Sequence, residues 1–272
     1  MNLQTLLEIT DEIKQDCFDL KESWHEDDVR HSFFGLFYTT IYDFYIGKVA
    51  YRMSEYIGSG DIKFTREVIN FKSHAKRLFE IQDNNMLSIG YNNKLNRDVY
   101  IGTWTSFETS IAILFENLST DTDKLNIISD LNYKILKVIS KLEDPEKSAL
   151  KEITLKSQFI PIGRKFKFLR YLEPDNYIIS EYKKDVKFIE FCSKLRNCLI
   201  HTNGIYYGKD SEFDFMGCKF NFINGQVFEQ ENSNEYTMFH IAFELRNIFF
   251  RLTKSLQKFE YIEYPNDGQN IA

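Results

Sequence analysis

The sequence is poor in the residues that break helices or cross-link chains. Its 272 residues include four prolines and 12 glycines, so long stretches are free to be helical. The four cysteines (Cys17, Cys192, Cys198 and Cys218) form no C-x-x-C pair and show no framework spacing. We therefore expect free thiols in a reducing cytoplasm rather than a disulfide-stabilised scaffold.

Long uncharged apolar runs are also missing. The N-terminus lacks the basic-then-apolar pattern of a secretion signal. The most apolar stretch, Ser32 to Ile46, contains Asp43 and is soon followed by Lys48 and Arg52. It is too short and too charged to span a bilayer. The sequence therefore predicts a cytoplasmic protein with no membrane partner.

Several catalytic signatures are absent as well. There is no glycine-rich phosphate loop, no H-E-x-x-H and no G-x-S-x-G, so the sequence gives no support to a kinase, metalloprotease or serine hydrolase. Residues Trp24 to Asp28 with His31 include metal-ligand types, but their spacing matches no metal site. We interpret them as a solvated helix entry, and we expect neither a metal nor a cofactor.

The sequence also has no excess of positive charge. The net charge is −6, with 34 Lys and Arg against 40 Asp and Glu. A general nucleic-acid coat would be basic, so any contact with RNA must be local.

Hydrophobic and aromatic residues are abundant, at 43% and 16% of the chain, which indicates a packed core. Apolar spacing in the first part predicts helices at about 3–20, 29–57 and 65–86, the second apolar nearly all round and therefore buried. Ser88 to Asp98 has little periodicity and predicts a loop. We therefore expect residues 1–98 to form a helical N-terminal extension or subdomain.

Residues 99–272 predict a helical bundle that carries a small inserted β-hairpin. Thr105 and Glu108 match a capping box at a helix start. Further helices are expected at about 123–142, from about Pro174 to the motif described next, and at about 234–261. Alternating phenylalanines and the dipeptide Asn224-Gly225 predict the hairpin near 212–230, with a type I′ turn at that dipeptide. The fold class is therefore mainly α.

The segment with the clearest chemistry is Arg196-Asn197, followed by His201 and then by Asn203-Gly204 as a left-handed helix stop. A guanidinium can bind a phosphate, and an imidazole can transfer a proton near neutral pH. Asn197 lies four residues before His201, so the two share one helix face. Arg196 lies about 140° from His201, so it must reach around the helix or the helix must loosen. A purely structural interpretation is that cations near a helix C-terminus are favoured by the dipole.

The R-N-x-x-x-H pattern resembles the signature of the HEPN superfamily, the helical domains of many prokaryotic RNA-cleaving toxins and defence proteins. The resemblance is specific in the motif residues. Over about residues 102–262 it consists of a similar helical architecture. It implies a metal-independent endoribonuclease in which the ribose 2′-OH attacks the adjacent phosphorus. It also implies a composite site on a homodimer, RNA as the substrate, and an antitoxin or defence-system partner. The catalytic residues would be Arg196, Asn197 and His201.

Other residues have two interpretations each. Glu108 is either the acidic residue that some HEPN proteins carry on a neighbouring helix or a helix cap. Four basic residues lie close together in the sequence: Arg164, Lys165, Lys167 and Arg170. This basic cluster either binds RNA or is merely solvated. Leu245-Arg246-Asn247 repeats part of the motif without a histidine and is interpreted as structural. The alternative function for the whole chain is a non-catalytic helical module for dimerisation or for nucleotide or RNA binding.

Overall fold

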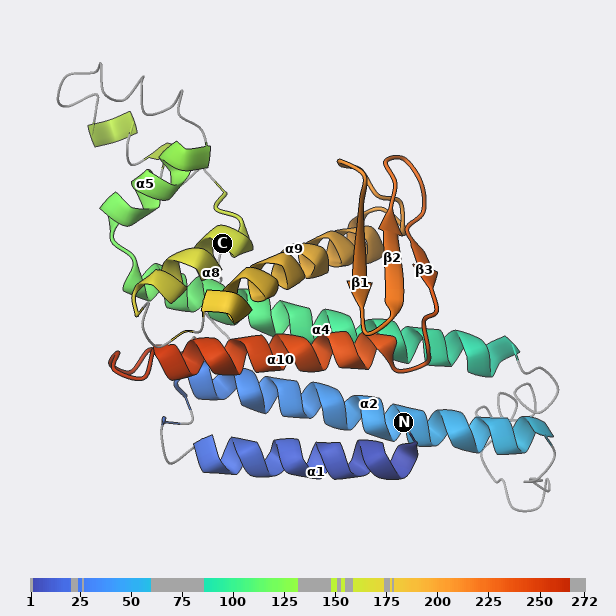
Figure 1. Cartoon of the computed structure of the whole chain (residues 1–272). Helices are drawn as coiled ribbons and strands as arrows, with labels where there is room; N and C mark the ends of the chain where they lie inside the picture. Colours follow the sequence, from blue (N-terminus) through green and yellow to red (C-terminus); the bar gives the residue numbers. More distant parts are fainter. Residues whose placement is uncertain are drawn as a thin grey trace.

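The computed structural model describes residues 2–20, 24–25, 27–59, 86–131, 148–150, 153–154, 159–173, 177 and 179–264. The protein is mainly helical with one small antiparallel sheet, which confirms the expected fold class (Figure 1). No helix in these ranges combines the length and the apolar character needed to cross a membrane.

The first two helices follow the apolar spacing of the sequence. Helix α1 (Leu3–Leu20) buries Leu6 and Ile13 and packs along α2 (Val29–Ser59). Both match the predicted helices. The helix expected at 65–86 lies almost entirely outside the described residues, which resume at Met86.

The predicted loop at 88–98 is wrong, because Met86–Leu118 forms one continuous helix, α4. Packing against α2 overrides the low helix propensity of this asparagine-rich stretch. Asn92 Oδ1 accepts a hydrogen bond from Lys48 Nζ at 2.7 Å, and the Leu95 side chain lies against Gly47. The boundary expected after residue 98 therefore falls inside α4, and buried residues on both sides of it belong to one core.

The second half contains α5 (Asp121–Leu131), α8 (Ile162–Tyr171), α9 (Ile179–His201) and α10 (Thr237–Ser255). The capping box predicted at Thr105–Glu108 is wrong, since both residues lie inside α4. A reciprocal cap instead starts α5, where Thr120 N donates to Asp123 Oδ2 at 2.9 Å and Asp123 N donates to Thr120 Oγ1 at 3.2 Å. Residues 132–142 and 174–176, where other helix bounds were expected, are not described.

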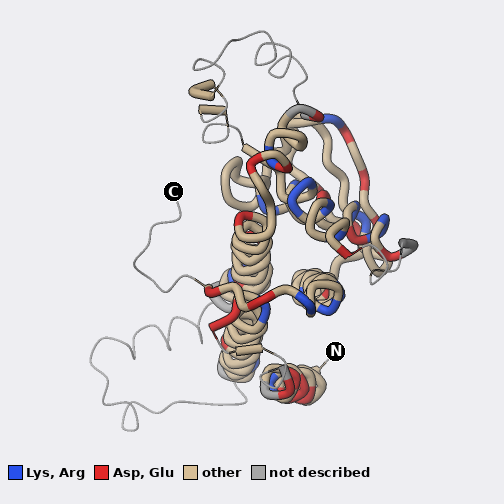
Figure 2. The backbone as a smooth tube through the Cα atoms, turned by 90° about the vertical axis from the view of Figure 1, so that its left-hand side faces the viewer, with Lys and Arg blue, Asp and Glu red and all other residues tan. Residues whose placement is uncertain are grey.

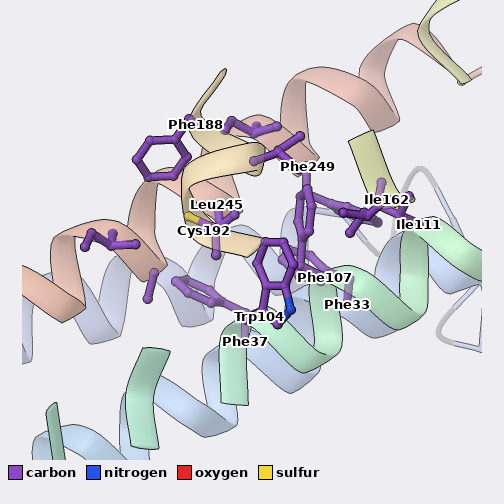
Figure 3. Close-up of a cluster of buried hydrophobic side chains, with 14 of the residues drawn as sticks. Phe33, Phe37, Trp104, Phe107, Ile111, Ile162, Phe188, Cys192, Leu245 and Phe249 are labelled. Atoms are coloured by element: carbon purple, nitrogen blue, oxygen red, sulfur yellow. The ribbon is translucent and has the colours of Figure 1, made fainter. Parts of the chain in front are cut away.

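The core forms where α2, α4, α9 and α10 meet (Figure 3). The rings of Phe33 and Phe249 lie 4.0 Å apart between centroids, and Phe107 approaches both within 6.3 Å. All three side chains are fully buried. Burying one such ring stabilises the fold by about 1.5–3 kcal/mol, so this cluster is a major source of stability.

The region around Arg30 joins the beginning of α2 to the chain beyond α10. Arg30 pairs with Asp28, and both side chains are buried. The solvated helix entry predicted at Trp24 to Asp28 with His31 is therefore wrong for Trp24, Asp28 and His31, which are all buried. Arg30 Nη1 also donates to the carbonyls of Leu256 at 2.8 Å and Phe259 at 3.1 Å. Since the guanidinium has several N–H donors, Arg30 can donate hydrogen bonds both to its carboxylate partner and to backbone carbonyls after α10.

The sheet lies between α9 and α10 in the chain, at the position expected for the hairpin, but it has three strands: β1 (Ser211–Phe215), β2 (Cys218–Phe222) and β3 (Glu229–Glu231). The tight turn between β1 and β2 is at Met216-Gly217, where both residues have positive φ. The type I′ turn predicted at Asn224-Gly225 is wrong, because only Gly225 has positive φ there.

Candidate functional site

Helix α9 is held against the core by one buried face and by the sheet. The buried face carries Phe188, Ile189, Cys192 and Leu195. Phe191 stacks on Phe213 of β1 with ring centroids 4.3 Å apart. The helix that carries the motif is therefore fixed from two directions (Figure 1).

A partly buried ion pair adds a third restraint on α9. Arg251 of α10 donates to both carboxylate oxygens of Asp185, at 3.0 and 2.7 Å, and to Glu244 Oε1 at 3.0 Å. Tyr177 also donates to Asp185. Two-pronged contacts of this kind fix orientation as well as distance.

The end of α9 is fixed by a left-handed turn and by strand pairing. Asn203 and Gly204 have φ of 49° and 88°, which confirms the predicted helix stop. Gly204 N donates to Cys198 O at 2.7 Å. Beyond the turn, Phe228 N donates to Gly204 O and Tyr206 N donates to Gln226 O, both at 2.9 Å. The segment before β3 thus holds the last turn of the motif helix.

The three predicted catalytic residues come together on the last turns of α9. Arg196 Nη1 lies 2.7 Å from His201 Nε2 and donates to Asn197 Oδ1 at 3.2 Å. The helix continues through His201, so Arg196 reaches around it rather than meeting a loosened turn. Asn197 and His201 are exposed and Arg196 is half-buried.

The contact between arginine and histidine defines the state of the imidazole. A guanidinium has only donors, so His201 Nε2 must accept the hydrogen bond and be unprotonated. A ring nitrogen that presents a lone pair is the one that accepts a proton in general base catalysis.

Arg196 is poorly satisfied by the rest of the protein. Its Nε is buried and has no hydrogen-bond partner among the described residues. Within the same part of the chain, no carboxylate forms an ion pair with it. Its positive charge is therefore available to an anion.

Tyr100 supports the turn that carries Arg196, and sequence reasoning missed it. Its hydroxyl donates to the carbonyl of Cys192 at 2.5 Å, from α4 to α9. Complete burial raises the pKa of Tyr100 well above its usual value, so it stays protonated. No local signal could have identified this residue, because the two partners are 92 residues apart.

The partial repeat of the motif in α10 has the same local geometry and a different partner. Arg246 Nη1 donates to Asn247 Oδ1 at 3.2 Å, as Arg196 does to Asn197. However, the Arg246 guanidinium is paired with Asp16 of α1 and packs on the rings of Phe34, Phe243 and Phe250. Arg246 therefore holds α1 against α10, in agreement with its structural interpretation.

Glu108 lies inside α4 and is half-buried, with Oε2 accepting from Trp104 Nε1 at 3.1 Å. It lines a cavity together with Arg164 and Lys167, two of the four cations of the predicted basic cluster. Lys165 instead lies over the Phe115 ring at 5.6 Å, and burial lowers its pKa. Arg170 is 4% exposed and sits over two tyrosine rings, so it does not belong to the surface.

The part of the chain that the structure describes contains no candidate site for metal or thiol chemistry. No group of three or more His, Cys, Asp or Glu there is placed to hold a metal ion. Burial raises the pKa of Cys192 and of Cys198, so both thiols are protonated at neutral pH and are not nucleophiles.

Comparison with family models, with curated proteins and with solved structures gives no match to this chain. The HEPN resemblance accordingly rests on the motif residues and stays a prediction.

Proposed function

We propose that the protein is a metal-independent endoribonuclease of the HEPN type, acting as a toxin or in antiviral defence. The observation that carries this proposal is the Arg196–His201 contact of 2.7 Å, made by a guanidinium with no carboxylate partner in the described chain. An anion-binding group and a proton acceptor are thus joined at an exposed helix end. A single-stranded phosphodiester can reach both.

The reaction follows from the properties of the two side chains. A phosphate attracts the Arg196 guanidinium through charge-assisted hydrogen bonds, which frees Nε2 of His201. That nitrogen takes the proton of the ribose 2′-OH as the 2′-oxygen attacks phosphorus. The bond from phosphorus to the 5′-oxygen breaks and leaves a 2′,3′-cyclic phosphate. Arg196 stabilises the charge that builds on the phosphoryl oxygens.

The leaving 5′-oxygen needs a proton from a second group. The motif of one chain holds a single histidine, so we propose that the acid is His201 of a twofold-related copy, in its protonated form. Exposed apolar side chains surround the motif and favour such a contact. They are Ile200, Tyr207 and Val227. A symmetric dimer would place two arginines and two histidines in one cleft.

The test is cleavage of a labelled single-stranded RNA and a tRNA pool in EDTA. We expect products ending in a 2′,3′-cyclic phosphate, identified by mass spectrometry, and no cleavage when a single 2′-deoxy sugar replaces the scissile ribose. Arg196→Ala and His201→Ala should each lose at least 100-fold in rate. Matched controls are Arg97→Ala and His25→Ala, which remove exposed residues elsewhere and should retain the wild-type rate.

Two results would overturn the proposal. Retained cleavage in both motif variants would place the reaction elsewhere, most simply in a contaminant. Binding of RNA by a folded dimer without cleavage would leave the non-catalytic module as the function.

A further inference from the structure

A cavity of about 770 Å³ opens between α4, α8 and α9, beyond the motif residues. Helix α8 contacts both of the other helices, so the cavity has walls from three elements (Figure 1). Its volume is within the range of small-ligand sites, about 300–1,000 Å³. It is large enough for one nucleotide.

The walls of the cavity are strongly basic. Five cations line it: Arg164, Lys167, Lys183, Lys187 and Lys194. Two carboxylates, Glu108 and Glu190, oppose them and leave an excess of three positive charges. The whole chain is acidic, with a net charge of −6, so this excess is local. A cavity of this kind favours an anion.

Helix α1 is acidic and carries five carboxylates: Glu8, Asp11, Glu12, Asp16 and Asp19. Both views place α1 on the side opposite α8 and α9, and Figure 2 marks the acidic residues of α1 in red near the N-terminus. A polyanion is therefore repelled from α1 and drawn toward the cavity.

An exposed aromatic ring stands among the cavity residues. Phe159 lines the cavity and is 78% exposed, which burial cannot explain. Tyr182, half-buried, supplies a second aromatic ring to the same wall. Exposed aromatic rings beside cations are the combination on which unpaired bases stack while phosphates are held.

The cavity and the motif share one face of α9. At about 100° per residue, Glu190, Lys194, Asn197 and His201 lie within roughly 60° of one another. The rise of about 1.5 Å per residue places Lys194 about 10 Å from His201 along the helix. A strand lying along this face can occupy the cavity and reach His201 at the same time.

We propose that the cavity binds one unpaired nucleotide of a single-stranded RNA and so positions a phosphate of the same strand at His201. This inference rests on the proposed ribonuclease function, since it assigns the second contact of the same substrate. The cations hold the phosphate of the bound nucleotide, and Phe159 stacks on its base. The carboxylates accept hydrogen bonds from the base edge or the ribose hydroxyl.

The test measures binding of a fluorescent single-stranded RNA to the full-length protein in the His201→Ala background, which removes cleavage. The pocket variant is Lys183→Glu with Lys187→Glu, both exposed residues of α9. The control variant is Lys14→Glu with Lys94→Glu, which changes the net charge equally on α1 and at the start of α4. We expect at least tenfold weaker binding for the pocket variant and less than a twofold change for the control.

Two further readouts separate a defined site from diffuse charge. The slope of log Kd against log salt should fall by about 0.7 in the pocket variant, because the contact with the phosphate of the bound nucleotide is lost. Phe159→Ala leaves the charge unchanged and should weaken RNA binding about fivefold or more through loss of stacking. Duplex RNA should bind wild-type protein at least tenfold more weakly than the single strand.

Equal loss of binding in the pocket and control variants, or equal affinity for duplex and single strand, would overturn the inference. This failure is distinct from a failure of the proposed function. Loss of binding confined to the pocket variant supports the site even if wild-type protein cleaves nothing. Cleavage by a pocket variant with wild-type affinity rejects the site while leaving the ribonuclease intact.

Discussion

Gly204 and Val227 meet where α9 ends, and a β-carbon added to Gly204 would lie 3.3 Å from Cγ1 of Val227. Gly204 also has φ of +88°, which a residue with a side chain rarely adopts. We expect Gly204→Ala to lower the free energy of unfolding by about 1–2 kcal/mol, measured by urea denaturation. RNA cleavage should fall further than stability accounts for, because the last turn of α9 moves.

The control for this change is Gly35→Ala in α2, where an added β-carbon meets nothing within 4 Å. A helix interior favours alanine, so this variant should gain about 0.5–1 kcal/mol. Similar effects of the two substitutions would contradict the strain assigned to Gly204.

Arg196→Lys tests whether charge alone suffices in the site. Lysine keeps the positive charge but lacks the rigid planar guanidinium whose Nη1 contacts both His201 and Asn197. We expect about a 100-fold loss in RNA cleavage rate, close to that of Arg196→Ala, with an unchanged melting temperature. Arg97→Lys, on the exposed face of α4, is the matched control. Near-normal cleavage by Arg196→Lys would reduce the role of Arg196 to simple electrostatic attraction.

Phe249→Ala removes the ring that joins α10 to α2 and α4. The side chain is fully buried 4.0 Å from Phe33, so we expect a loss of about 3–5 kcal/mol in unfolding free energy. Phe159→Ala deletes the same group at a site that is 78% exposed and should change stability by no more than about 0.5 kcal/mol. Chemical denaturation of both variants checks the difference, and a comparable loss in the two would contradict the core described for α10.

The buried Lys48 makes stability depend on pH in alkaline solution. Burial lowers its pKa from the usual 10.5 to about 8, although Glu235 Oε2 lies 3.6 Å from Nζ. The unfolded chain therefore binds more protons than the folded chain between pH 8 and 10.5, so this group makes stability rise with pH over that window. Other groups titrate there as well, which makes the comparison with a variant necessary.

We expect wild-type protein to gain about 1–3 kcal/mol relative to Lys48→Met between pH 7.5 and pH 10.5, measured by denaturation at each pH. The exposed Lys94→Met should show no such trend against wild type. A constant difference between wild type and Lys48→Met across this window would show that burial does not perturb the lysine.

Local patterns predicted the parts of the fold that local forces decide. The helices at 3–20 and 29–59 follow from apolar spacing, and the stop at Asn203-Gly204 follows from left-handed turn chemistry. The loop expected at 88–98 failed because Asn92 and Leu95 are held by Lys48 and Gly47 of another helix. Propensity alone does not include such contacts.

The candidate site also has a part that the sequence predicts and a part that it does not. The sequence places Arg196, Asn197 and His201 on one helix end, and their contact follows from short separation. The cavity could not be predicted, because it joins Glu108 to Arg164 and Glu190 from three helices. The support of Cys192 by Tyr100 is likewise a long-range contact without a local signature.

The contact of Arg30 with the carbonyl of Leu256 joins residues 226 positions apart. The ribosome therefore makes Arg30 long before it makes the partner of this contact. On the ribosome, the helix with Arg196 and His201 emerges before α10 supplies Phe249 and before the carbonyls that satisfy Arg30 exist. A nascent chain that ends inside the sheet carries every motif residue without the core that positions them. We therefore expect the contacts among Arg196, Asn197 and His201 to form only once the chain has been made through α10, so incomplete translation products would carry the motif residues without the proposed activity.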